Sequence, residues 1–183
     1  MERWQSCTRC FLKEVRHRTV LVRGDVPCDV LMIGEAPGKS EDDLGAPFVG
    51  PAGQLLDQIL KRSVPDGVRV ALTNLVACIP LTDDGKKLTE PPVEAVEACT
   101  PRLLEIIDLA NPAVVVCVGT EARDWLDQKY SRCIPCNRPM IDVLHPAYIL
   151  RQNYVQQGLL AQQVVVAIGT AVDEYVTGGR PAV

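Results

Sequence analysis

The chain has 183 residues, of which 47% are hydrophobic, so it is long and apolar enough to bury a substantial core. Its net charge of −4 argues against a protein that holds nucleic acid through overall positive charge. The charge is uneven, however, because residues 1–23 carry six Lys/Arg and two Asp/Glu, a local +4, which leaves −8 for the remainder. A basic face for phosphates and an ordinary solvated basic end both explain this asymmetry.

The sequence has no long uncharged apolar segment, so we expect no membrane-spanning helix. The first residues lack the apolar core of a secretory signal, which predicts a cytoplasmic protein.

Strand and helix patterns alternate along the chain. Strands are predicted at residues 29–34, 68–74, 113–119 and 140–145, and helices at residues 52–62, 92–110, 121–128 and 154–176. Helical crossovers between strands imply an α/β fold, a three-layer α/β/α sandwich around a central, mostly parallel four-stranded sheet. We expect residues 1–183 to form one domain.

A glycine-rich loop follows the first strand and fills much of residues 34–57. We expect Gly34 and Gly38 to be glycines because a compact turn needs positive φ. Glu35 lies at the carboxyl end of the strand, where open α/β sheets bind ligands. Phe48 is an aromatic residue on a loop. A carboxylate and an aromatic ring on such a loop suit a flat, polar ligand such as a nucleobase.

Three polar residues lie at the ends of predicted strands: Glu35 after the first, Asn74 at the second and His145 at the fourth. The carboxyl ends of parallel strands share one edge of a sheet, so these residues should converge on one pocket. His145 precedes a proline, which favours an extended conformation there. A hydrogen-bonded structural histidine is the alternative interpretation.

The eight cysteines favour metal ligation or buried thiols over disulfides in a cytoplasmic chain. Cys7 and Cys10 form one Cys-x-x-Cys pair, and Cys133 and Cys136 form another. From spacing alone, a four-thiolate zinc site built from both pairs is a serious alternative. Two further residues, Cys28 and Cys117, are expected to be small core side chains.

Several motifs together resemble the uracil-DNA glycosylase superfamily, specifically its iron-sulfur (family 4) branch. They are Gly34-Glu35-Ala36-Pro37-Gly38 with Pro47-Phe48-Val49-Gly50, Leu72-Thr73-Asn74-Leu75-Val76, and His145-Pro146-Ala147-Tyr148-Ile149-Leu150-Arg151, with ordered cysteines between them. The resemblance covers residues 7–155, and the joint order of motifs is far more specific than a lone glycine-rich loop.

The resemblance implies a [4Fe–4S] cluster held by Cys7, Cys10, Cys78 and Cys99. Such a cluster would tie the N-terminal segment, residues 1–24, to the body of the domain. Cys133 and Cys136 are then ordinary loop thiols, a redox pair or a second metal site, and we favour loop thiols.

The resemblance also implies that the protein flips uracil out of DNA and excises it hydrolytically, leaving an abasic site. His145 would stabilise the departing base anion by hydrogen bonding, and Glu35 would stabilise positive charge on the sugar and position water. Phe48 would stack on the base, and Asn74 would hydrogen-bond to its edge. The backbone of Gly34, Ala36 and Gly38 would also hold the base. Glu41 would exclude bases with bulkier 5-substituents.

The segment after His145 is implied to enter the minor groove and to wedge the base stack apart. Tyr148, Ile149 or Leu150 would be the wedge, and Arg151 would contact phosphate. The alternative is the first turn of a helix that packs its apolar face into the core.

The chain departs from the family pattern around Cys78. The family has basic neighbours there, as in Lys-Cys-Arg-Pro, whereas this chain has Ala77-Cys78-Ile79-Pro80. The segment from Cys78 to Cys99 is also long. The expected partner is double- or single-stranded DNA, bound by a monomer. Three alternatives stay open: excision of a modified base such as a hypermodified cytosine of viral DNA, a non-catalytic iron-sulfur DNA-binding module, and an electron-transfer protein.

Overall fold

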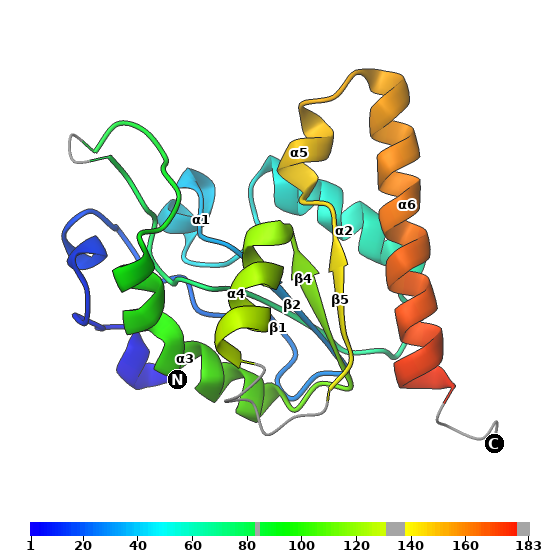
Figure 1. The fold of residues 1–183 in the computed structure, drawn as a ribbon, viewed down its shortest axis with the longest axis horizontal. Coiled ribbons are helices and arrows are strands. Elements are labelled where there is room, and N and C mark those ends of the chain that lie inside the picture. The colour runs from blue at the N-terminus through cyan, green and yellow to red at the C-terminus, as the bar shows by residue number, and fades with distance from the viewer. Residues whose placement is uncertain (83–84, 131–137, 179–183) are drawn as a thin grey trace.

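The computed structural model describes residues 1–82, 85–130 and 138–178 (Figure 1). Five strands form one mixed sheet in the order β1-β3-β2-β4-β5. The strands are β1 (Arg23–Gly24), β2 (Val30–Gly34), β3 (Val70–Asn74), β4 (Val114–Val118) and β5 (Met140–Val143). β2 to β5 pair in parallel, whereas β1 pairs antiparallel with β3.

The four predicted strands and the parallel α/β architecture are therefore confirmed, and the predicted strand count is wrong by one. β1 contributes only Arg23 and Gly24, which pair with Leu72 and Ala71 of β3. Two residues are too few to show the alternation of apolar and polar side chains that identifies a strand in a sequence. This strand exists because it pairs with the edge of β3.

The helices cover both faces of the sheet. They are α1 (Lys39–Leu44), α2 (Pro51–Ser63), α3 (Val93–Ala110), α4 (Thr120–Tyr130), α5 (Pro146–Leu150) and α6 (Tyr154–Val172), with short turns η1 (Glu2–Trp4), η2 (Phe11–Glu14) and η3 (Asp173–Thr177). The four predicted helices are confirmed as α2, α3, α4 and α6. The sequence did not predict α1 and α5, which are too short to establish a helical period.

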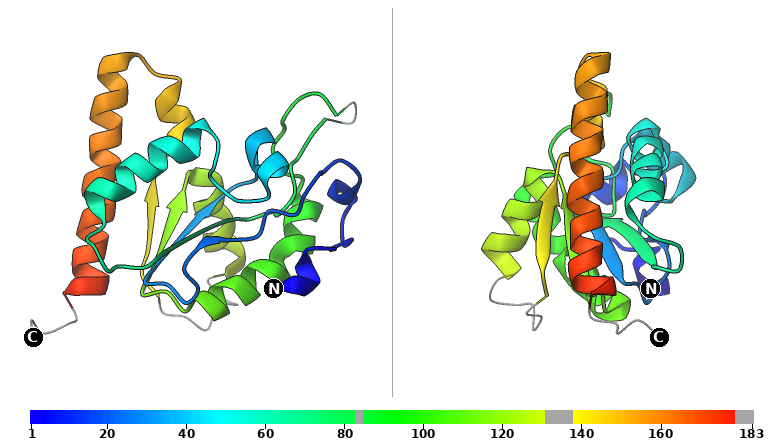
Figure 2. Two further views of the ribbon diagram at one scale, coloured as in Figure 1. Left: turned by 180° about the vertical axis from the view of Figure 1, so that it is seen from behind. Right: turned by 90° about the vertical axis from the view of Figure 1, so that its right-hand side faces the viewer.

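Alternate side chains of each inner strand enter different halves of the core. Leu31 and Ile33 of β2 pack with α3 and α4, whereas Val30 and Met32 pack with α2 and α6. This period of two is what a sheet buried on both faces requires. The result is the three-layer arrangement seen from the side in Figure 2.

The last helix, together with η3, is long and apolar enough to cross a membrane by length and composition (residues 154–177, mean hydropathy 1.3). This finding corrects the expectation that the chain contains no such segment. In the structure, however, one side of α6 lies in the core against the sheet and α2, with Val164, Ile168 and Val172 buried. Packing accounts for this buried side only, because Val155, Leu159 and Val166 on the same helix are exposed.

The N-terminal segment lies against the body through its own hydrogen bonds. Trp4 donates from Nε1 to the carboxylate of Glu105 in α3 at 2.7 Å, and the amide of Val20 donates to the carbonyl of Ala77 at 2.8 Å. These contacts bring the first Cys-x-x-Cys pair beside α3 and beside the chain that follows β3.

Candidate active site

The three polar residues predicted to converge do so. Glu35, Asn74 and His145 line one pocket of about 260 Å³ at the carboxyl edge of the sheet. Pairing of Gly34 with Asn74 fixes β2 and β3 in register at that edge. The complete lining is Glu35, Ala36, Pro37, Gly38, Glu41, Phe48, Ala52, Gly53, Asn74, Pro80, Leu88, Thr89, His145 and Ala147. The pocket therefore contains almost every residue to which a base-binding or catalytic role was assigned, Gly34 lying directly beneath it.

The reason given for Gly34 and Gly38 was wrong, because neither residue has positive φ. Gly34 is required by crowding instead. A Cβ atom there would lie 2.6 Å from both Oδ1 of Asn74 and Cζ of Phe48. At Gly38 a Cβ atom would lie 2.9 Å from Oε2 of Glu41. The missing Cβ atom at Gly34 leaves room for the Asn74 amide and the Phe48 ring at the end of β2.

Phe48 has an unusual backbone, with φ of 55°, a conformation that a side chain rarely adopts. Its carbonyl oxygen would lie 1.9 Å from a Cβ atom at residue 53, so the chain there must be glycine. The Phe48 side chain is buried, only 6% exposed, and contributes to the core as well as to the pocket. Its ring centroid lies 6.3 Å from that of His145. Strained backbone held by tight packing is a common feature of functional sites.

His145 precedes α5 as its N-cap, in the extended conformation that the following proline predicted. Its Nδ1 accepts a hydrogen bond from the amide of Ala147 at 3.1 Å. The neutral ring therefore carries its proton on Nε2. Burial lowers the pKa of His145, and the nearby Arg151 acts in the same direction, against a smaller opposing effect of Glu41. The site thus holds a neutral imidazole with one N–H available for a ligand.

Gly119, at the end of β4, explains how His145 reaches this pocket from β5. It has φ of +98°, which favours glycine, and a Cβ atom placed on it would contact the His145 side chain at 3.4 Å. β4 lies between β5 and β2 in the sheet. The positive φ of Gly119 favours glycine, and the turn after β4 passes directly beside the imidazole. Sequence reasoning did not identify this residue, although a glycine directly after an apolar strand is a recognisable signal.

Glu35 occupies an environment that disfavours its charged form. Burial raises the pKa of its carboxyl group, and the like charges of Glu121 and Glu90 raise it further. A carboxylate whose charge is poorly compensated is suited to attract developing positive charge or to take a proton from water.

Glu41 is held by the backbone of two loops. Its Oε1 accepts hydrogen bonds from the amides of Val49 at 2.9 Å and Gly50 at 2.7 Å, and its Oε2 accepts one from Gly38 at 3.1 Å. The carboxylate therefore braces the glycine-rich loop against the segment that carries Phe48. The predicted exclusion of bulky 5-substituents is a separate role, and it stays a prediction.

One wall of the pocket comes from a loop that the sequence did not connect with the site. This loop contributes Pro80, Leu88 and Thr89 to the pocket lining. An isolated antiparallel β-bridge pairs Leu81 with Leu88 across the loop. The loop projects beside α1 in Figure 1. Leu88 is 52% exposed, so part of its side chain faces solvent at the pocket wall.

The segment after His145 folds as α5, and its side chains separate by environment. Tyr148 and Leu150 are exposed, at 44% and 39%, and Arg151 is exposed as well. Ile149 is fully buried in the core, so the structure does not support it as a wedge. For Ile149 the alternative interpretation, helix packing, is correct, which leaves the other three side chains available to DNA.

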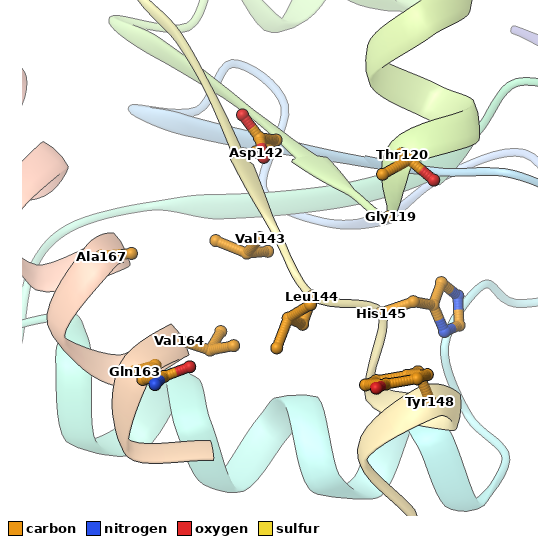
Figure 3. Close-up of a pocket in the computed structure, with 10 residues that line it drawn as sticks. All are labelled: Gly119, Thr120, Asp142, Val143, Leu144, His145, Tyr148, Gln163, Val164 and Ala167. Carbon is orange, nitrogen blue, oxygen red and sulfur yellow. The ribbon is translucent and has the colours of Figure 1, made fainter. Parts of the chain in front are cut away.

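A second, larger hollow of about 420 Å³ adjoins the first through His145 (Figure 3). It runs between β5 and α6, with His145 and Tyr148 at one end and Val164 and Ala167 of α6 at the other. The imidazole thus lies between two hollows, one lined by Glu35 and Asn74 and the other by Thr120, Asp142 and Gln163.

The four cysteines implied as cluster ligands also meet. Cys7, Cys10, Cys78 and Cys99 line one small cavity between the N-terminal segment, the chain after β3 and α3. Arg16 donates a hydrogen bond to Sγ of Cys78 at 3.2 Å, and the amide of Ala77 donates to Sγ of Cys99 at 3.4 Å.

These sulfur atoms do not gather at one point, and the alternative zinc site with Cys133 and Cys136 involves residues outside the described part of the chain. In the part of the chain that the structure describes, the set of three or more possible ligand atoms within 4.8 Å of one another is His17, Asp42 and Asp43, not the cysteines. One zinc ion would draw four sulfurs to a common point, whereas a cluster spreads its thiolates over separate iron atoms. N–H donors to sulfur are also typical of cluster environments.

The remaining cysteines divide into two groups. Cys28 and Cys117 are buried among strand residues, 2% and 0% exposed, which confirms them as core side chains. Burial raises their thiol pKa values to about 11 and about 12. Cys133 and Cys136 lie outside the described residues, so their predicted role as loop thiols is not tested.

Comparison with known proteins gives the family of this chain. The family model for the Uracil DNA glycosylase superfamily matches residues 22–167. The chain belongs to that superfamily. A type-4 uracil-DNA glycosylase of Thermotoga maritima is 34% identical over 165 residues, which is 83% of this chain and 82% of the relative. A type-4 uracil-DNA glycosylase of Pyrobaculum aerophilum is 40% identical over 118 residues, 63% of this chain and 56% of the relative.

The chain therefore spans little more than half the length of some of these superfamily relatives and most of the length of others. Among solved structures, the crystal structure of SMUG2 from Pedobacter heparinus superposes with a TM-score of 0.61 at 15% identity, covering 80% of this chain and 76% of that one. At this identity the likeness supports the superfamily fold alone.

Proposed function

We propose that this chain is a monofunctional DNA glycosylase that hydrolyses the N-glycosidic bond of uracil in DNA and leaves an abasic site. The observation that carries the proposal is the pocket in which a neutral His145 imidazole meets Glu35, Asn74 and Phe48. The names of the type-4 relatives give the same substrate.

The chemistry follows from the charge that develops as the bond breaks. The uracil leaves as an anion, and the sugar acquires oxocarbenium character. The Nε2–H of His145 donates to a carbonyl oxygen of the leaving base and stabilises the anion. The Glu35 carboxylate stabilises the sugar cation, orients a water molecule and takes a proton from it as its oxygen bonds to the sugar carbon. The departing uracil anion then takes up a proton from solvent.

Recognition precedes the chemistry. The flipped base stacks on the Phe48 ring, and the Asn74 amide pairs with the edge of the base, offering one donor and one acceptor. Glu41 holds the two loops together and places its carboxylate at the pocket wall, where it would exclude larger 5-substituents. No lysine is among the described residues that line the pocket, which favours direct hydrolysis over a Schiff base.

The cofactor that we propose is a [4Fe–4S] cluster on Cys7, Cys10, Cys78 and Cys99, supported by their common cavity and by the sulfur hydrogen bonds. The cluster would supply cross-links between three segments of the chain rather than a step in base excision. We also propose that residues 1–24 are attached by it to a single domain comprising the whole chain.

DNA is the proposed partner, bound by a cytoplasmic monomer with the target base flipped out. Tyr148 or Leu150 would fill the gap left in the base stack, and Arg151 would contact phosphate. Ala77 and Ile79 supply no positive charge beside Cys78, so Arg151 carries more of the phosphate attraction than it would if basic residues flanked the cysteine.

The deciding experiment is excision from defined duplexes and single strands that contain uracil, hypoxanthine, thymine opposite guanine, or a hypermodified cytosine. We expect cleavage at uracil, and no covalent enzyme–DNA adduct on borohydride treatment. Excision of a modified base without uracil would keep the mechanism and replace the substrate. Inactivity on every duplex, with DNA still bound, would instead favour a binding module.

A further inference from the structure

A buried arginine connects the two sites. Arg102 lies in α3 and is 1% exposed, which makes it the largest fully buried side chain in the described residues. Its guanidinium donates to Oγ1 of Thr73 at 3.1 Å and to the carbonyl oxygens of Asn74 at 2.5 Å and Leu75 at 2.8 Å. These acceptors are all neutral, and its Nε atom is buried without a hydrogen-bond partner.

A buried guanidinium normally requires a negative partner, because taking a charge out of water is costly unless it is compensated. In the part of the chain that the structure describes, Arg102 takes part in no ion pair with a carboxylate. The hydrogen bonds to neutral oxygens satisfy part of the group and leave its charge uncompensated.

The compensating charge is available on the other side of the side chain. Arg102 lines the same cavity as Cys7, Cys10, Cys78 and Cys99. Four cysteine thiolates on an iron-sulfur cluster carry net negative charge in an enclosed, apolar setting. Arg16 also lines this cavity and donates to Sγ of Cys78 at 3.2 Å, but it is only partly buried, whereas Arg102 is fully buried.

We propose that Arg102 is a positioning residue with two partners: it is the buried counter-charge of the cluster, and it holds the Asn74 end of β3 against that cluster. The inference rests on the proposed function, because it needs a cluster in the cysteine cavity. One planar side chain then joins the cofactor to the backbone of the residue that reads the base.

The two roles are separable with two substitutions. Arg102→Gln keeps most of the side chain's length and a donor but loses the charge, whereas Arg102→Lys keeps the charge with fewer donors. Arg9→Gln is the matched control, since Arg9 lines the same cavity but is exposed and donates to the carbonyl of Ala98. All proteins are purified anaerobically as the full chain.

Two measurements test the role of the Arg102 charge: the reduction potential of the cluster and the rate at which a chelator removes its iron. Loss of a buried positive charge destabilises the reduced cluster, so Arg102→Gln should lower the potential. It should also accelerate iron loss by about 10- to 100-fold, the range expected for removing a hydrogen-bonded charged partner. Arg102→Lys should restore most of both properties, and Arg9→Gln should resemble the wild type.

Hydrogen exchange of the backbone around Asn74 and Leu75 tests the proposed connection through Arg102 between the cluster and the end of β3. Removal of iron from the wild-type protein should accelerate exchange there, which needs no variant and therefore covers the case in which Arg102→Gln does not fold. Equal potentials and equal iron loss in Arg102→Gln and Arg9→Gln would overturn the inference, even if uracil is still excised and iron is present. A wild-type protein without iron would overturn the inference and the proposed cofactor together, independently of uracil excision.

Discussion

The proposed base pocket around Glu35, Asn74 and His145 differs in construction from the cysteine cavity lined by Cys7, Cys10, Cys78 and Cys99. The chain from Asn74 to Pro80 contributes to both. The base pocket has about 260 Å³ of room and keeps the Nε2–H of His145 available. The cysteine cavity has about 10 Å³ of room, and N–H groups of Arg16 and Ala77 already point at its sulfur atoms. The first has room for a ligand beside its polar groups, whereas the second is almost closed.

This difference separates the consequences of substitution at each site. Residues of the base pocket should change the rate or the choice of base while the protein keeps its stability. Residues of the cysteine cavity should change stability and metal content first. Four substitutions test that division, in order of decreasing expected effect.

The largest effect on rate should come from His145→Ala. The imidazole interacts with charge that is present mainly in the transition state, so its loss should lower the single-turnover rate of uracil excision about 100- to 1,000-fold. Affinity for uracil-containing DNA and iron content should change little. His17→Ala is the matched control, because His17 is exposed and lies outside the pocket. A near-normal rate for His145→Ala would show that the pocket is assigned wrongly.

Cys7→Ser should give the largest loss of stability. Removing Cys7 leaves the N-terminal segment attached to the proposed cluster by Cys10 alone, and part of the metal-binding free energy is then lost from folding. For a domain of this size, each kcal/mol lost lowers the melting temperature by roughly 2–4 °C. Iron analysis and thermal unfolding measure the effect. Cys28→Ala, at a buried cysteine outside the cavity, should keep its iron, and iron retention by Cys7→Ser would contradict the ligand set.

Asn74→Asp should change the choice of base more than the stability. An aspartate has no amide donor for a carbonyl oxygen of uracil, yet it can accept a hydrogen bond from the exocyclic amine of cytosine. Excision rates on matched duplexes should therefore shift from uracil toward cytosine. Asn153→Asp, which keeps the N-cap acceptor of α6, serves as the control. An unchanged base preference in Asn74→Asp would remove Asn74 from base reading.

The smallest effect should be a shift in the pH profile of Glu90→Gln. Excision needs the Glu35 carboxylate in its charged form, so the rate rises with pH through the pKa of that group. Burial raises this pKa most, and Glu121 and Glu90 add to it. Removing the Glu90 charge should therefore move the acidic limb to lower pH, by less than about one unit. Glu94→Gln, in the exposed first turn of α3, should leave the limb in place. A shift to higher pH would contradict the stated cause.

The convergence of Glu35, Asn74 and His145 was predictable because it depends on parallel strand order, which alternating strands and helices reveal. Glycine usage was not interpreted correctly. Gly34 was attributed to backbone conformation, but it is required by the close approach of Phe48 and Asn74. Such crowding depends on side chains that are distant in sequence, so no local pattern announces it.

Two further features could not be read from the sequence. Leu88 enters the pocket wall because a loop folds back across the site, and nothing in the loop's composition indicates that contact. Arg102 lies on the buried stripe of α3, three residues after Cys99 and four before Ile106, although an arginine is typically placed on the solvent side. Its burial follows from carbonyl oxygens at the end of β3, which are backbone groups without a sequence signature.

The loop between Cys78 and Cys99 has a consequence for how this family of pockets diversifies. Both cysteines line the cysteine cavity. Between them, the chain supplies Pro80, Leu88 and Thr89 to the proposed base pocket. A loop anchored firmly at its two ends can lengthen with little thermodynamic penalty, since closure entropy grows slowly with length. Insertions can therefore accumulate in this stretch and reshape which base is admitted, while the catalytic residues on the strand ends remain untouched.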